Sequence, residues 1–221
     1  MEKRTPPILS IVTPTRGNFS DDWLDNLLQV EGEVQFILVY PPGVSLRKIA
    51  DARVTSLVSP YKGEMMQRFI GLLNATGQYM IALDDDDLIH PGVLDLASAY
   101  FQRFPESWML RLSKNVIDFR QVEQINRAWD VIPDVEALAI CCKTPENPHP
   151  YQGGKFIGLL EVPIAPLTKP LNWRAVLPFM KRLDNHGYHF ENFNNIVWRN
   201  HLVQAALIDL GQTTRWLGAI T

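Results

Sequence analysis

The first hundred residues alternate between short apolar runs and stretches with helical spacing, and this alternation restricts the fold more than any other feature. Three runs are almost continuously apolar: ILSIVTP at 8–14, VQFILVY at 34–40 and QYMIAL at 78–83. A weaker run, ARVTSLVSP, occupies 52–60. Strands with this composition are typically buried on both faces, as they are in mostly parallel sheets that helices cover.

Helical stripes separate or follow these runs. Apolar residues recur at helical spacing over 21–30, 62–75 and 91–104. Ser20 or Asp21 suits the N-cap of the first helix, and Gly77 stands where a C′ glycine would end the second. Pro91 is typical of the first turn of a helix, so it predicts the start of the third helix. The alternation predicts an α/β fold with a mostly parallel, Rossmann-like central sheet flanked by helices.

The second half of the chain is less regular. We expect strands over 107–119 and 136–142 and two helical stretches within 171–211. No internal repeat and no clear linker interrupts the sequence. We therefore expect one domain over 1–221.

Composition excludes a few function classes. The chain has 21 basic and 24 acidic residues and a net charge of −3, so it lacks the basic field of a typical nucleic-acid-binding protein. No apolar run approaches the ~20 residues of a membrane span. Cys141 and Cys142 are adjacent, a poor geometry for a mutual disulfide, and we interpret them as buried thiols in a reducing cytoplasm.

Four consecutive aspartates, Asp84–Asp87, follow the last of the apolar runs. Two unit charges about 4 Å apart repel by ~1 kcal/mol even in water, so solvent or a cation must compensate. A solvated turn needs one aspartate and gains nothing from four. Mg²⁺ and Mn²⁺ bind one or two carboxylates, together with waters and phosphates. The turn PTRGN at 14–18 also follows a strand, so we expect both turns at the carboxyl edge of the sheet, where ligands bind.

The stretch KGEMMQRFIGLLNATGQYMIALDDDDLIHPGVL at 62–94 resembles the core of the family 2 glycosyltransferases, which have the GT-A fold. An arginine-containing helix, an A-x-G-x-Y turn, a strand, an L-D-x-D-D motif and a proline-started helix follow in the family's order. The matching residues are Arg68, Gly71, Ala75, Gly77, Tyr79, Leu83, Asp84, Asp86, Asp87 and Pro91. LSIVTPTRGN at 9–18 resembles the family's opening strand and P-T-x-N turn, so the resemblance covers 8–104.

This resemblance implies a nucleotide-sugar donor, a divalent cation (Mn²⁺ or Mg²⁺) and inversion at the anomeric carbon. Asp86 would bind the metal, while Asp85 and Asp84 would face the ribose and the donor sugar. The remaining donor contacts implied are Pro14, Thr15 and Arg16 at the base and ribose, and Arg68 at the nucleotide.

The chain departs from the family after its second strand, where Tyr40-Pro41-Pro42 replaces an aspartate pair that reads the base. We expect the ring of Tyr40 to stack on the base instead, and a UDP-sugar is the favoured donor.

Segment 186–200 resembles the family's region that supplies the catalytic base, with Glu191 at the matching position. The alternative is a glutamate that only stabilises the first turn of a helix. Trp129 and Trp173 lie in the half that should contact the acceptor, and they are our candidates for stacking on sugar rings.

These observations predict a hexosyl- or deoxyhexosyltransferase that acts on a hydroxyl of a glycan, lipid or other acceptor, as in cell-surface polysaccharide biosynthesis. Residues 1–105 would bind the nucleotide-sugar and 106–221 the acceptor. The alternatives are a phosphohydrolase with an aspartate nucleophile, a sugar-nucleotidyltransferase and a sugar-nucleotide-binding protein without activity. The phosphohydrolase would have threonine or valine where Leu88 stands, and the nucleotidyltransferase needs a glycine-rich first turn.

Overall fold

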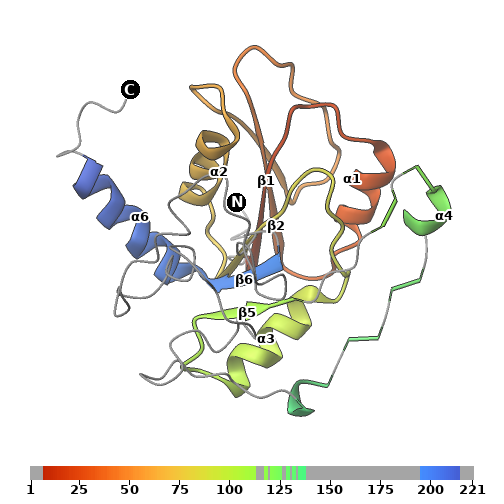
Figure 1. Cartoon of the computed structure of the whole chain (residues 1–221), viewed down its shortest axis with the longest axis vertical. Coiled ribbons are helices and arrows are strands. Elements are labelled where there is room, and N and C mark those ends of the chain that lie inside the picture. Colours follow the sequence, from red (N-terminus) through yellow and green to blue (C-terminus); the bar gives the residue numbers. More distant parts are fainter. Residues whose placement is uncertain are drawn as a thin grey trace, which may run out of the picture. The chain divides into compact units, whose positions relative to one another are not determined.

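The computed structural model describes residues 7–112, 117–118, 120–125, 128–129, 131–132, 134–137 and 195–214. Its centre is a six-stranded sheet with the strand order β3-β2-β1-β4-β6-β5 (Figure 1). The parallel strands are β1 (Leu9–Pro14), β2 (Val34–Tyr40), β3 (Val54–Val58) and β4 (Tyr79–Ala82). The sheet continues through β6 (Ile196–Arg199), which is antiparallel to β4 and to β5 (Met109–Arg111). The predicted α/β fold with a mostly parallel sheet is confirmed.

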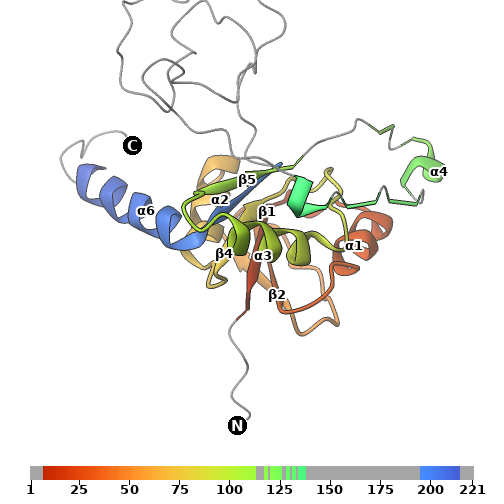
Figure 2. The same cartoon turned by 90° about the horizontal axis from the view of Figure 1, so that it is seen from below.

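Helix α2 packs on one face of this sheet and α3 on the other. The described helices are α1 (Asp21–Leu28), α2 (Glu64–Leu73), α3 (Val93–Arg103), the short α4 (Val122–Ile125), the 3₁₀ helix η1 (Val135–Ala137) and α6 (Asn200–Thr214). Figure 2 shows α6 running outward from the sheet. In the described part of the chain, no helix combines the length and the apolar character needed to cross a membrane.

The core has one layer on each side of the sheet. On the side of α2, a cluster contains Val12, Ile37, Val39, Ala75 and Met80. Gly71 lets α2 approach closely, since a Cβ there would lie 2.2 Å from Cγ1 of Val12. On the other side, the ring of Tyr79 in β4 stacks on Phe101 of α3 with ring centres 4.6 Å apart.

Two helix boundaries differ from the prediction. Helix α2 ends at Leu73 with Asn74 as its C-cap, so Gly77 is not the C′ glycine. Gly77 instead passes against β1, where a Cβ would lie 2.8 Å from the backbone nitrogen of Ser10. Helix α3 begins at Val93 after the N-cap Gly92, so Pro91 precedes the helix and is not in its first turn.

The second half of the chain differs more from the predicted secondary structure. Strand β5 is limited to Met109–Arg111, and residues 136–137, expected in a strand, belong to the 3₁₀ helix. Residues 196–199 form β6 within a segment for which we predicted helix. The open edge of β4 explains this, because Trp198 and Arg199 pair with β4 there while Ile196 and Val197 pair with β5 and are buried. Such packing overrides a helical pattern.

A matched polar network lies at the amino end of β4. Asn200 Nδ2 donates to the carbonyls of Ala75 (2.9 Å) and Gly77 (2.8 Å), while its Oδ1 accepts from Gln204 (3.0 Å). The N–H of Gly77 donates to Ser10 Oγ at 2.9 Å, and Ser10 Oγ donates to Gln35 at 2.8 Å. These bonds attach α6 and the turn before β4 to the sheet.

Candidate functional site

The carboxyl ends of β1 and β4 meet at the point where the strand order reverses. The chain leaves β1 towards β2, while β4 pairs with the opposite edge of β1. Thr15 Oγ1 donates to Asp85 Oδ2 at 2.6 Å, and the N–H of Arg16 donates to the same oxygen at 3.3 Å. The predicted meeting of the two turns is therefore confirmed, at the place where α/β sheets bind ligands.

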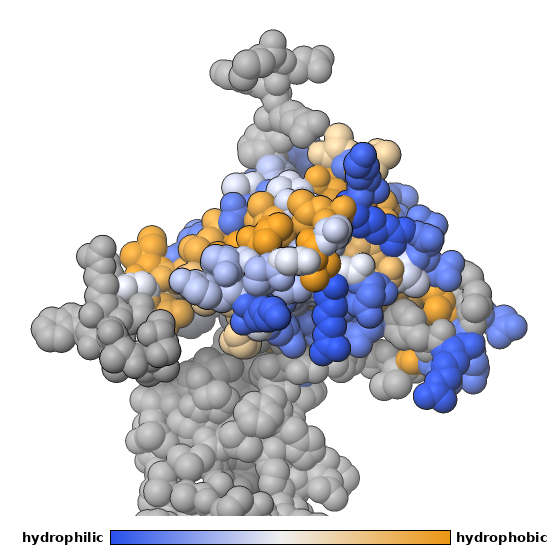
Figure 3. All heavy atoms as spheres, turned by 90° about the horizontal axis from the view of Figure 1, so that it is seen from above, coloured by the Kyte–Doolittle hydropathy of each residue, from blue (hydrophilic) through white to orange (hydrophobic). Residues whose placement is uncertain are grey.

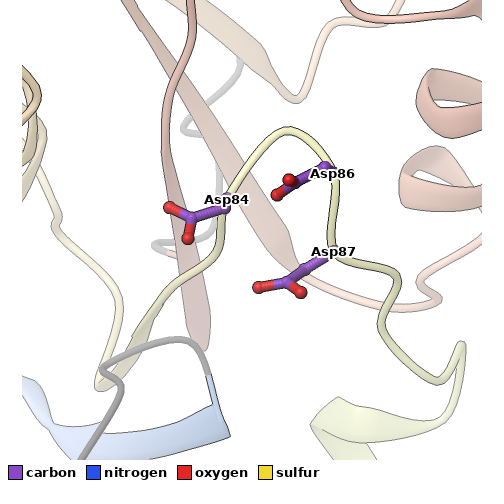
Figure 4. Close-up of side chains that lie close together, drawn as sticks. All are labelled: Asp84, Asp86 and Asp87. Atoms are coloured by element: carbon purple, nitrogen blue, oxygen red, sulfur yellow. The ribbon is translucent and has the colours of Figure 1, made fainter. Parts of the chain in front are cut away.

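Three of the four aspartates gather around one tight turn. The N–H of Asp87 donates to the carbonyl of Asp84 at 3.1 Å, which closes the turn. Carboxylate oxygens of Asp84, Asp86 and Asp87 all lie within 4.8 Å of one another (Figure 4). The fourth, Asp85, contacts the β1 turn. The turn thus concentrates oxygen ligands of the kind that Mg²⁺ and Mn²⁺ prefer.

Arg68 of α2 lies beside this turn. Its Nη2 forms an ion pair with Asp84 and a second one, at 2.9 Å, with Glu64. The side chain is 11% exposed, and its Nη1 is buried without a hydrogen-bond partner among the described residues. The single positive charge of Arg68 is therefore shared between the carboxylates of Asp84 and Glu64. It does not neutralise the further negative charges of Asp86 and Asp87.

The electrostatic cost of the cluster is visible at Asp86. Partial desolvation raises the pKa of its carboxyl above the ordinary value, and the charges of Asp87, Asp85 and Glu64 raise it further. Each cause disfavours the ionised form. A bound cation would reverse this effect by favouring the carboxylate.

Two buried side chains hold the turns in place, and we did not predict either role. Trp23 of α1 is 1% exposed, and its indole N–H donates to the carbonyl of Asp87 at 2.8 Å. Gln67 of α2 is 6% exposed, and its Nε2 donates to the carbonyls of Thr15 (2.8 Å) and Val39 (2.5 Å). In the sequence Trp23 belongs to an ordinary apolar stripe, so no local signal marks its contact with Asp87.

The predicted base contacts are placed unevenly. Pro14 and Thr15 are buried, and Arg16 is exposed. Tyr40 is fully buried, with its ring centre 6.5 Å from that of Phe19, and this burial raises the pKa of its phenol. In this conformation, Tyr40 offers no open face on which a base could stack.

Exposed apolar side chains do occur at the carboxyl end of β3 and in the segments that follow β2 and β3. They are Leu46, Val58, Tyr61 and Met65. Apolar side chains bordered by hydrophilic ones also gather on the face seen in Figure 3. Tyr61 is 66% exposed, and its carbonyl accepts a hydrogen bond from Ser59 Oγ at 2.7 Å. An open aromatic ring therefore stands three residues before Glu64, which pairs with Arg68.

Trp129 lies against the segment that follows the acidic turn. It is 38% exposed, and its ring centre is 5.3 Å from that of His90. Of the remaining candidates, Glu191 and Trp173 lie outside the described residues. The structure thus brings together the aspartates, Thr15, Arg16 and Arg68.

No protein-family model matches the chain, and no curated protein matches it. Solved structures that resemble it include S. aureus TarS 1-349 in complex with UDP, with a TM-score of 0.42 and 17% identity over 51% of this chain and 37% of that chain. S. aureus TarS 1-349 in complex with UDP-GlcNAc gives a TM-score of 0.39 and 19% identity over 51% and 36%. The chain thus spans well under half the length of these proteins. A likeness of this extent does not identify a function.

Proposed function

We propose that the protein is a metal-dependent, inverting glycosyltransferase of the family 2 type that transfers a sugar from a UDP-sugar to a hydroxyl of an acceptor. One observation carries this proposal. The acidic turn lies at the switch point between β1 and β4, with Arg68 beside it, in a segment whose residues follow the order of that family.

The residues present suit a divalent cation. Asp86 is the proposed ligand, because its carboxylate is exposed and lies in the cluster with Asp84 and Asp87. Asp84 is engaged by Arg68, and it is the proposed contact for the donor sugar. When bound, Mn²⁺ or Mg²⁺ would stabilise the negative charge of the departing nucleoside diphosphate.

Arg68 is the proposed contact for the diphosphate. A guanidinium presents its donors in a planar fork, which suits phosphate oxygens. Its Nη1 is buried and has no hydrogen-bond partner among the described residues, so an anionic ligand would supply an acceptor that the guanidinium still lacks. The ion pair with Asp84 would keep the guanidinium oriented before the donor arrives.

The base would stack on Tyr61 rather than on the buried Tyr40. Tyr40 ends β2 and Tyr61 follows the neighbouring strand β3, but only Tyr61 has an exposed ring. Tyr61→Ala should weaken UDP binding, because stacking of an aromatic ring on a base contributes about 1–3 kcal/mol. Tyr61→Phe should retain most of the affinity.

Transfer also requires a base for the proton of the acceptor hydroxyl, and Glu191 is the proposed group. Glu191→Gln should lower kcat by about 10²–10⁴-fold and leave the Kd for UDP unchanged, because the proton moves only in the transition state. If Glu191 only stabilises a helix, Glu191→Gln should lower Tm slightly while the folded enzyme keeps its turnover. Asp184 would then be the next residue to test.

The proposed function is tested first by nucleotide binding. Tm is measured with UDP, GDP, ADP or CDP, each with and without Mn²⁺, since a ligand that binds the folded state raises Tm. UDP with Mn²⁺ should give the largest increase in Tm. A second assay should then show transfer of a sugar from a UDP-sugar. If no nucleotide raises Tm and the protein instead releases phosphate from sugar phosphates, the phosphohydrolase alternative holds.

A further inference from the structure

Trp129 and His90 form an aromatic pair next to the acidic turn. His90 is three residues beyond Asp87, and three residues extend at most about 11 Å. The ring of Trp129 is 5.3 Å from that of His90 and inclined to it by 59°. The distance from this pair to the proposed cation site is therefore no more than about the length of a disaccharide.

The pair is held in place from both sides. The N–H of Gly92 donates to His90 Nδ1 at 3.0 Å, which fixes the imidazole. Gly92 also admits Ile132, since a Cβ there would lie 2.7 Å from Cδ1 of Ile132. Trp129 thus contacts His90, and Ile132, three residues after Trp129, packs at Gly92, yet Trp129 remains 38% exposed.

We infer that Trp129 and His90 form a stacking subsite for a pyranose ring of the acceptor, which makes the acceptor a glycan. This inference rests on the proposed function, because that function supplies the reacting sugar at the acidic turn. A pyranose has an apolar face of C–H groups that suits an indole, and hydroxyls at its edge that need polar partners.

The surroundings favour a sugar over a lipid chain. The segment between His90 and Asp87 consists of Leu88 and Ile89, and Ile89 is buried. His90 and the carboxylates after β4 thus stand at its two ends, and they can accept hydrogen bonds from hydroxyls. An acyl chain would need continuous apolar surface. Next to Trp129, Val131 adds the surface of one small aliphatic side chain, 94% exposed.

The test uses the full chain labelled with 5-fluorotryptophan and observed by ¹⁹F NMR. W129F and W108F assign two of the six tryptophan signals. Trp108 is the matched control, because it is 68% exposed and directly precedes β5, the strand at one edge of the sheet. The probes are cellobiose, lactose and N,N′-diacetylchitobiose, each with and without UDP and Mn²⁺.

At least one disaccharide should shift the Trp129 signal saturably and leave the Trp108 signal in place. W129A should weaken that disaccharide about tenfold, W129F less, and W108A not at all. The inference is overturned if no disaccharide shifts the Trp129 signal, or if W108A weakens binding as much as W129A. It is also overturned if vesicles of phosphatidylglycerol and phosphatidylethanolamine shift the Trp129 signal and the disaccharides do not.

The same sample separates this inference from the proposed function. If a disaccharide binds at Trp129 while UDP with Mn²⁺ leaves Tm unchanged, the glycan subsite stands and the glycosyltransferase proposal fails. If UDP with Mn²⁺ raises Tm and no disaccharide shifts the Trp129 signal, the glycosyltransferase proposal stands and the glycan subsite fails.

Discussion

The two ends of β4 are both polar, but they are polar in different ways. At the amino end, Asn200, Gln204, Ser10 and Gly77 exchange hydrogen bonds between neutral groups. At the carboxyl end, four aspartates follow the strand, and Arg68 is shared between Asp84 and Glu64.

This difference separates a structural role from a binding role. A matched network of neutral groups lowers the free energy of the folded chain by itself, because each buried donor has an acceptor. A cluster of like charges raises it, as the pKa of Asp86 indicates. We therefore expect changes at the amino end to alter stability, and changes at the carboxyl end to alter ligand binding.

The largest stability effect is expected for Asn200→Ala. The carbonyls of Ala75 and Gly77 would both lose a buried partner, which should lower the free energy of unfolding by about 2–3 kcal/mol. Urea denaturation measures this, with His201→Ala at the exposed next position as the control. The division of roles between the two ends of β4 is contradicted if Asn200→Ala weakens UDP binding to the folded protein and barely changes its stability.

Gly77→Ala also tests the amino end of β4, because the added Cβ would press against the backbone of β1. The new Cβ would lie 2.8 Å from the nitrogen of Ser10 and 2.9 Å from the carbonyl carbon of Leu9, and neither can move independently of β1. We expect a loss of about 1–3 kcal/mol. Gly211→Ala is the matched control, since apart from the backbone of α6 itself no atom of the described residues lies within 4 Å of its Cβ position, and it should stabilise by up to about 1 kcal/mol.

Thr15→Val and Thr13→Val compare two buried threonines of the β1 region. Thr15 Oγ1 donates to Asp85, whereas Thr13 Oγ1 has no hydrogen-bond partner within the described ranges. Thr15→Val should cost about 1 kcal/mol and weaken UDP binding with Mn²⁺, because it separates the two turns of the site. Thr13→Val should be neutral or stabilising, and equal losses in both variants would contradict this account.

The smallest effect is expected for Asp86→Asn without ligand. Since the pKa of Asp86 is raised by folding, the folded protein loses stability as pH rises through that pKa. Asp86→Asn should therefore raise Tm slightly at pH 7, and the gain should vanish below about pH 3.9, where the aspartate is neutral in both states. Asp25→Asn, on the exposed side of α1, controls for the change in net charge. A lower Tm for Asp86→Asn at pH 7 would show that its carboxylate stabilises the fold.

Sequence patterns predict those parts of this molecule that depend on neighbouring residues. Strand β2 begins and ends at the predicted residues, and the acidic turn follows β4 as expected, because apolar runs and their breaks are local signals. Strand β6 was missed, since its reason for forming is the open edge of β4, more than a hundred residues earlier.

The site shows the same division. Its aspartates and Arg68 are visible as a motif, but the burial of Tyr40 depends on Phe19, and the contact of Trp23 with Asp87 joins residues 64 apart. Such contacts are set by the way α1 packs on the sheet. No spacing rule within one segment reveals them.

The central claim is that the unbalanced charge after β4 serves a cation and a nucleoside diphosphate. The most direct measurement is calorimetric titration of UDP into the wild-type protein and into Asp86→Asn, each with and without Mn²⁺. We predict that UDP binds the wild-type protein only with Mn²⁺, and that Asp86→Asn loses this binding while remaining folded. Equal Mn²⁺-dependent affinity in both proteins, or UDP binding to the wild-type protein that ignores Mn²⁺, would contradict the claim.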